Sequence, residues 1–217
     1  MITATILAIL GLCLIAVVWQ MFRAPARVLP AGEAPTGRHI PATNPIDVDP
    51  WEARRGDVIS VSGAAEDYSD IDFAVDRRSA YEAINHRWID LSGDFRGRRV
   101  YLEVYRYPQQ DLIGILDGRK LTLTDIGVTE AALAEIDSRQ DPSAFITYAG
   151  KQWRYESSRE IGYFENESND GEGLYRWLFD EQDGSRLLCI EKWEGEPFEV
   201  RIARRLNPHD VTVYRAA

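Results

Sequence analysis

Two glutamates are the side chains of this sequence that are best placed for catalysis. Glu103 ends the run Arg-Arg-Val-Tyr-Leu-Glu that begins at Arg98, and Glu191 ends the similar run Arg-Leu-Leu-Cys-Ile-Glu that begins at Arg186. If the fold brought the two runs together, the pKa of one carboxyl group would rise, and the pair could act as general acid and base in a hydrolase. The competing hypothesis, which we favour, is that each glutamate pairs with Arg98 or Arg186 of the other run, or faces water.

Aromatic side chains form a second group of candidates, in this case for ligand binding. Aromatic residues in strands usually pack in a core or against a neighbouring strand. A groove lined by aromatics and rimmed by acids would instead hold a cationic small molecule such as a polyamine, through cation–π and carboxylate contacts. It could equally hold an extended peptide added to an edge strand. The candidate residues are Trp88, Tyr105, Trp153, Trp177 and Trp193.

Residues typical of metal sites and covalent catalysis are scattered along the chain. His39, His86 and His209 lie in unrelated contexts, and Cys189 has no cysteine or histidine nearby. No spacing matches a zinc site or an iron facial triad, so we expect no metal and no cofactor. The chain contains neither a Gly-x-Ser-x-Gly nucleophile elbow nor a phosphate-binding loop. Cys189 is flanked by leucine and isoleucine, which predicts an unreactive thiol.

The composition is acidic. The formal net charge is −10 and the pI is near 4.9. Nucleic-acid binding requires a positive face, so the charge argues against a nucleic-acid partner. An anionic membrane surface would also be repelled, and any membrane attachment must therefore come from insertion of apolar residues.

The first 50 residues predict such an attachment. Residues 1–23 begin with an uncharged apolar run of the length that crosses a bilayer, and they predict a transmembrane helix. Residues 24–50 contain six prolines and no apolar periodicity, which predicts an extended tether. The apolar run is followed by Arg23, Arg27 and Arg38. Because positively charged residues next to a membrane span stay in the cytoplasm, the rest of the chain is expected on the cytoplasmic side of the inner membrane.

The rest of the chain predicts a mainly β fold. Apolar and polar residues alternate in several short stretches, as in half-buried strands; these are residues 71–75, 87–91, 99–105 and 111–117. One helix is expected over residues 129–143, because Thr129 is a good N-cap, alanine and leucine follow, and Asp141-Pro142 ends the run.

Residues on either side of this helix predict an internal duplication, because similar landmarks recur in the same order. We therefore expect one β unit at 51–128 and a second at 144–217, each a bent sheet or small barrel, packed as one body. The matching segments are Ile59–Gly63 with Ile146–Gly150, Arg87-Trp88 with Arg176-Trp177, Arg98–Tyr105 with Arg186–Trp193, and Arg119–Ile126 with Arg204–Val211.

The landmarks also resemble a known family. The stretches concerned are Arg55–Ile59, Arg87-Trp88, Trp153–Glu156, Arg176-Trp177 and Leu188–Glu194. Over roughly residues 51–217 the chain is similar to the bacterial domain of unknown function 4178 family. The resemblance implies a β-rich fold and an association with genes of membrane stress and polyamine metabolism, and it implies no activity, cofactor or catalytic residue.

The preferred functional expectation is a single-pass, membrane-anchored binding or adaptor protein. Its tether would position a cytoplasmic β body to engage a protein partner in a membrane complex, or a small cationic ligand. The alternative is a hydrolase that uses Glu103 and Glu191. A purely structural subunit of a membrane assembly is the third hypothesis.

Overall fold

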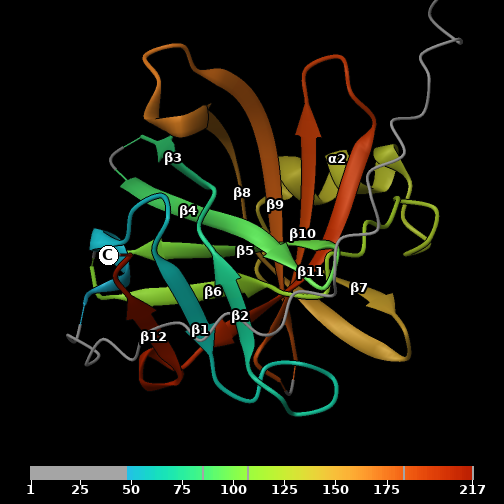
Figure 1. Cartoon of the computed structure of the whole chain (residues 1–217). Helices are drawn as coiled ribbons and strands as arrows, with labels where there is room; N and C mark the ends of the chain where they lie inside the picture. Colours follow the sequence, from blue (N-terminus) through green and yellow to red (C-terminus); the bar gives the residue numbers. More distant parts are fainter. Residues whose placement is uncertain (1–47, 85, 107, 183, 217) are drawn as a thin grey trace, which may run out of the picture. The chain divides into compact units, whose positions relative to one another are not determined.

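The computed structural model describes residues 48–216 apart from 85, 107 and 183 (Figure 1). This part of the chain contains one α-helix, α2 (Glu130–Arg139), and three short 3-10 helices, η1 (Pro50–Glu52), η2 (Glu165–Glu167) and η3 (Pro208–Asp210). Its strands are β1 (Val58–Val61), β2 (Ile71–Ala74), β3 (Arg77–Ala83), β4 (His86–Phe95), β5 (Arg98–Tyr105), β6 (Asp111–Ile115), β7 (Phe145–Tyr148), β8 (Lys151–Phe164), β9 (Glu172–Glu181), β10 (Arg186–Trp193), β11 (Phe198–Leu206) and β12 (Val211–Tyr214). The prediction of a mainly β fold with a short helix is confirmed.

Eight antiparallel strands close into a barrel (Figure 1). Their order is β3-β4-β5-β6-β11-β10-β9-β8, and the end of β8 returns to pair with β3. The start of β8 pairs instead with β7, which extends the sheet beyond the point of closure. Closure leaves no free edge along the ring, and it creates an interior onto which every second side chain of each strand projects.

A three-stranded sheet, β12-β1-β2, packs on the outer face of β4, β5 and β6. β4 is therefore buried on both faces: Ile89 and Leu91 point to this outer layer, while Trp88 and Asp90 alternate with them. Gly93 lets the two layers approach closely, because a Cβ atom there would collide with the carbonyl oxygen of Ala74. Burial on both faces explains why this strand lacks a clear polar side in the sequence.

The outer face of β8 to β11 is covered by residues 121–148, including α2 and β7. Leu133 is the buried residue of α2, and the Thr129 side chain accepts a hydrogen bond from the backbone N–H of Ala132 at the helix start. The predicted N-cap is thus confirmed. Gln140 adopts a left-handed backbone conformation and ends the helix.

The structure bears on two predictions of chain organisation. The predicted units 51–128 and 144–217 each contribute four neighbouring strands to one ring, β3–β6 from the first and β8–β11 from the second, so that neither unit closes into a barrel by itself. At the end of the predicted tether 24–50, Pro50 is buried in η1 and Val48 packs on the core.

The predicted membrane segment, residues 1–23, lies outside the described residues, as does most of the tether. Within residues 48–216, with their three gaps, the structure contains no helix that is both long and apolar enough to span a bilayer.

Candidate ligand-binding site

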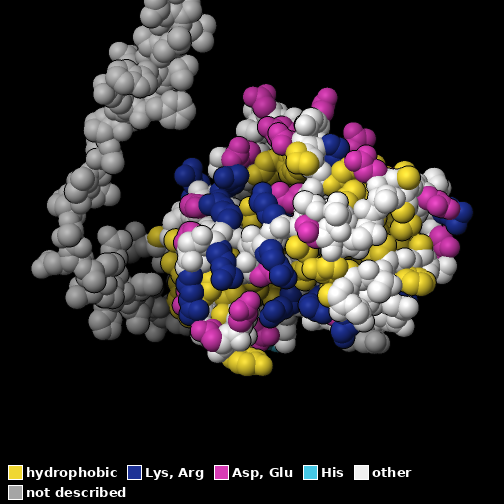
Figure 2. Space-filling view, turned by 90° about the vertical axis from the view of Figure 1, so that its right-hand side faces the viewer, with side chains coloured by type: hydrophobic (Ala, Val, Ile, Leu, Met, Phe, Trp, Pro, Cys, Tyr) yellow, Lys and Arg dark blue, Asp and Glu magenta, His cyan; other side chains and the backbone are white. Residues whose placement is uncertain are grey.

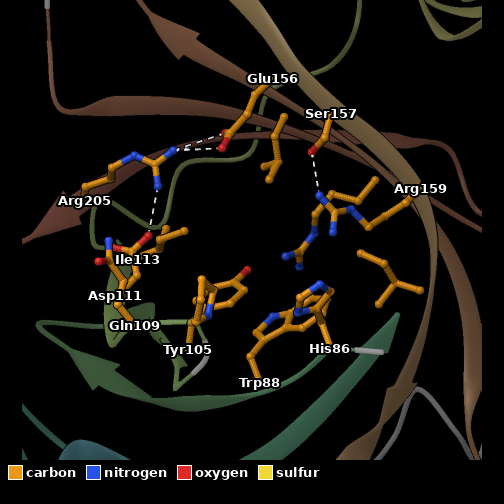
Figure 3. A pocket seen from close by; sticks show the side chains of 14 residues that line it. His86, Trp88, Tyr105, Gln109, Asp111, Ile113, Glu156, Ser157, Arg159 and Arg205 are labelled. Atoms are coloured by element: carbon orange, nitrogen blue, oxygen red, sulfur yellow. Dashed lines mark hydrogen bonds and ion pairs between the residues drawn. The ribbon is translucent and has the colours of Figure 1, made fainter. Parts of the chain in front are cut away.

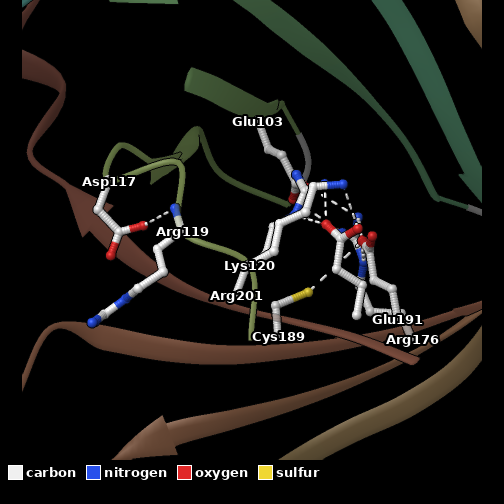
Figure 4. Close-up of polar contacts among 9 residues, drawn as sticks. Glu103, Asp117, Arg119, Lys120, Arg176, Cys189, Glu191 and Arg201 are labelled. Atoms are coloured by element: carbon white, nitrogen blue, oxygen red, sulfur yellow. Dashed lines mark hydrogen bonds and ion pairs between the residues drawn. The ribbon is translucent and has the colours of Figure 1, made fainter. Parts of the chain in front are cut away.

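A buried cluster of charged side chains lies inside the barrel (Figure 4). The Arg176 guanidinium contacts Glu191 through Nε at 2.9 Å and Nη2 at 2.6 Å. It also contacts Glu103 through Nη1 at 3.1 Å and Nη2 at 2.9 Å. All three residues are at most 5% exposed. Burial of two carboxylates is compensated by one cation that hydrogen-bonds both, as buried charges require.

The barrel brings Glu103 and Glu191 together. Both glutamates contact Arg176, whereas the sequence had indicated Arg98 or Arg186 as their partners. Arg176 faces Glu191 directly in the β9–β10 register, and Glu103 reaches it from β5. Arg98 is exposed, and Arg186 pairs with Glu181 instead. The signal available in the sequence was the alternation Leu174, Arg176, Leu178, which places the arginine on an otherwise apolar face.

A further acid, Asp90, lies beside this cluster. Asp90 pairs with Glu103 in the β4–β5 register and is 3% exposed. Burial, reinforced by the negative charge of Glu103, raises the pKa of Asp90 to about 8, so it is mostly protonated at neutral pH. The Tyr105 hydroxyl donates to Glu103 Oε2 at 2.8 Å, and burial raises the pKa of that tyrosine.

Cys189 also faces this interior, with its Sγ 3.8 Å from Glu191 Oε1. Burial raises the pKa of the thiol far above its usual value. A protonated thiol beside a carboxylate is a poor nucleophile, which agrees with the expectation of an unreactive cysteine.

Three aromatic rings stack next to the charges. Trp88 lies between Tyr81 and Tyr105, at centroid distances of 5.3 and 5.1 Å and with nearly parallel planes. The Arg176 guanidinium sits 4.8 Å from the Tyr81 ring centroid and 5.8 Å from that of Trp88. Stacking and cation–π contacts thus hold the buried arginine in place. The indole N–H of Trp88 has no acceptor among the described residues.

The five aromatic candidates do not line a single groove. Trp88, Tyr105 and Trp193 belong to one interior cluster, where Trp193 meets Tyr163 edge to face. Trp153 and Trp177 lie on the outer face of the barrel, in the core beneath α2. Alternation along the strands separates them, since neighbouring side chains of a strand point to opposite faces.

A cavity of about 290 Å³ opens at one end of the barrel interior (Figure 3). We call it the mouth cavity. Trp88 and Tyr105 line it together, and Figure 3 shows the two rings side by side on one wall. The other residues that line the cavity are His86, Pro108, Gln109, Asp111, Ile113, Glu156, Ser157, Arg159, Ile161, Arg176, Leu178 and Arg205.

Charges are distributed unevenly around the mouth cavity. On one side, Arg205 contacts three carboxylates, at 2.9 Å from Asp111 and 3.1 Å from each of Glu156 and Asp180. Burial and the nearby charge of Asp180 raise the pKa of Glu156. On the other side, Arg159 donates to the Ser157 hydroxyl at 2.9 Å and forms no ion pair among the described residues. One side therefore carries excess negative charge, and the other carries an uncompensated positive charge.

These polar lining residues were missed in the sequence. Glu156 departs from strand alternation because the β8–β9 register shifts between Tyr155 and Ser157. Such a bulge adds one residue to the strand and interrupts the alternation of its side chains between the two faces. The apolar pattern of the sequence therefore does not predict where this side chain points. Asp111, Arg159 and Arg205 lie on three different strands, β6, β8 and β11, which only the closed barrel brings together.

No group of side chains suited to hold a metal ion occurs among the residues that the structure describes. The mouth cavity thus offers carboxylates, guanidinium groups and an aromatic wall, a combination that can bind a charged organic molecule.

Comparison with known proteins places the chain in a family. No curated protein matches it, and no solved structure does. The sequence model described as "Domain of unknown function (DUF4178)" matches residues 62–208, which span β2 to β11 and all strands of the barrel. The chain therefore belongs to the DUF4178 family, as its sequence landmarks had indicated.

Proposed function

We propose that this chain is a binding protein whose mouth cavity takes a small organic molecule with an amino group. The observation that carries the proposal is the group of three carboxylates around the single guanidinium of Arg205. A cation placed among these acids would offset their excess charge, including the charge of Asp180, which adds to the effect of burial in raising the pKa of Glu156.

The remaining walls of the cavity restrict the ligand further. Trp88 and Tyr105 offer an aromatic surface for an apolar chain or for the ammonium group itself. Arg159, on the far side, would repel a second ammonium group and attract a carboxylate. The cavity therefore suits an amine with a neutral or anionic far end better than it suits a polyamine.

Calorimetric titration of the full chain tests this. Among n-butylamine, 4-aminobutanoate and spermidine, with magnesium chloride as a control, we expect 4-aminobutanoate to bind most tightly. Asp111→Asn should weaken its binding by at least about tenfold, because a charge-assisted contact is lost.

Asp72→Asn is the matched control, since Asp72 is an exposed acid of β2 away from the cavity. Heat signals absent for all three amines would refute the proposed ligand class. Equal affinities of Asp111→Asn and the unmodified chain would place the amine elsewhere.

Attachment to a membrane completes the proposal. The uncharged run in residues 1–23 and the arginines that follow it support a single span with the barrel in the cytoplasm, next to a partner protein of a membrane complex. A reporter enzyme that is active only after export, fused to the C-terminus, should therefore be inactive. Strong activity of that fusion would reverse the orientation.

We also propose that the barrel arose by duplication of a four-stranded unit, β3–β6 and β8–β11. The matching positions of Glu103 and Glu191, both inside the barrel, support this. The matched tryptophans differ in orientation, since Trp88 lies inside the barrel and Trp177 lies on its outer face.

The alternative of a hydrolase has less geometric support. The Arg176 guanidinium occupies the position between Glu103 and Glu191, and each carboxylate already accepts from it. A general acid–base pair must reach substrate atoms. Glu103 and Glu191 are buried, and both carboxylates already contact Arg176.

A further inference from the structure

A second hollow, of about 470 Å³, lies on the surface and shares no lining residue with the mouth cavity. We call it the arginine groove. Five arginines from separate segments converge on it: Arg96, Arg98, Arg119, Arg186 and Arg204. Figure 2 shows Lys and Arg side chains gathered on one half of the face that points to the right in Figure 1. This concentration occurs in a chain whose formal net charge is −10.

Most of this positive charge lacks a partner. Arg96 pairs with Asp67 at 3.2 Å, and Arg186 pairs with the buried Glu181. Within the described part of the chain, Arg98, Arg119 and Arg204 form no ion pair with a carboxylate; Arg204 makes only a long contact, 3.5 Å, with a backbone carbonyl.

Two of the five arginines lie on neighbouring strands. Arg186 and Arg204 are directly opposite each other in the β10–β11 register. Like charges in such cross-strand positions destabilise a sheet. Glu181 compensates the charge of Arg186, whereas Arg204 has no carboxylate partner among the described residues and remains available to an anion at this position.

Aromatic rings fix two of the arginines at the groove. The Arg186 guanidinium lies 5.5 Å from the ring centroid of Trp153, and that of Arg96 lies 4.8 Å from the ring of Phe95. Guanidinium groups restrained in this way lose little entropy when they bind an anion, and their planar forks match phosphate oxygens in pairs.

We propose that the arginine groove binds a small phosphorylated molecule, as a second site that does not depend on the function proposed above. The volume corresponds to a small-molecule site. Glu66, Asp67 and Asp117 also line the groove, and they would repel the continuous phosphate chain of a nucleic acid. Phe95, which is half-buried, provides apolar surface for the rest of the ligand.

Calorimetry of the full chain with sodium pyrophosphate tests the proposal. The double variant Arg98→Gln with Arg119→Gln should bind pyrophosphate about tenfold or more weakly, with an unchanged melting temperature because both residues are exposed and unpaired. The control is Arg54→Gln with Arg55→Gln, which removes the same charge from exposed positions outside the groove. This control should change the affinity less than about twofold.

Absence of pyrophosphate binding would overturn the proposal, and so would an equal loss in both double variants, since net charge alone would then explain it. The source of the phosphate is tested by adding short-chain phosphatidylglycerol or phosphatidylcholine. Competition by phosphatidylglycerol alone supports a lipid headgroup in the groove. If neither lipid reduces pyrophosphate binding, the ligand of the groove is a soluble phosphate ester.

Discussion

Arg176→Gln is expected to destabilise the folded chain by about 3–5 kcal/mol, the usual cost of removing one member of a buried ion pair. The loss is large because Glu103 and Glu191 would remain in the barrel interior without their shared cation. Urea unfolding of the full chain in detergent, followed by tryptophan fluorescence, measures the effect.

Two further variants separate the loss of charge pairing from the loss of packing. Arg159→Gln removes an arginine that is also directed to the barrel interior but has no carboxylate partner among the described residues, and it should cost less than about 1 kcal/mol. Arg176→Met combined with Glu103→Gln and Glu191→Gln removes all three charges, and it should recover much of the lost stability. A triple variant no more stable than Arg176→Gln would show that packing, and not charge pairing, holds this region.

The same experiment bears on catalysis. If Glu103 and Glu191 have a structural role, Glu103→Gln and Glu191→Gln will lower the unfolding midpoint. A catalytic role predicts the opposite pattern, in which a measurable activity disappears while the midpoint stays the same.

Asp90→Asn is expected to stabilise the chain at neutral pH and to flatten its pH dependence. The pKa of Asp90 rises from 3.8 when unfolded to about 8 when folded. Between these values the folded chain holds a proton that the unfolded chain has released, so the free energy of unfolding falls as the pH rises. Each unit of the shift corresponds to about 1.4 kcal/mol, which makes the effect a few kcal/mol.

Unfolding free energies measured from about pH 5 to pH 8 test this, because the gain from Asp90→Asn should grow steadily with pH. The charged groups that act on Asp90 from the neighbouring strands are Glu103, Arg176, Arg201 and Glu191. Asp72→Asn, an exposed change of the same kind, should leave the slope unaltered. Parallel curves for Asp90→Asn and the unmodified chain would contradict the raised pKa.

Local pattern was enough to predict the helix and four strands of the first half, β2, β4, β5 and β6. Residues 99–105 alternate cleanly because one face of β5 packs on the three-stranded sheet and the other lines the barrel. Thr129 and Asp141-Pro142 delimit α2 through capping and proline chemistry that depends only on neighbouring residues. The strand β3 was missed, because its sequence Arg-Arg-Ser-Ala-Tyr-Glu-Ala mixes polar and apolar residues as a polar interior requires.

Contacts between distant strands could not be predicted in this way. Similar flanking residues identified Glu103 and Glu191 as a matched pair, but the partner Arg176 follows from barrel closure and register. Likewise, net charge described the surface poorly, since an acidic total conceals a groove lined by five arginines. Composition averages over a surface, whereas a ligand responds to local charge.

The closure of the barrel has a consequence for folding kinetics. β3 and β8 are joined through three residue pairs, and the Ser79 and Tyr163 hydroxyls that meet there at 3.0 Å are 84 residues apart in the chain. Contacts of such separation form late, because the long intervening loop must be ordered first. The β6–β11 junction is likewise joined through three residue pairs, and these two junctions should open before the longer pairings in the ring, so that their amide protons exchange with solvent ahead of global unfolding.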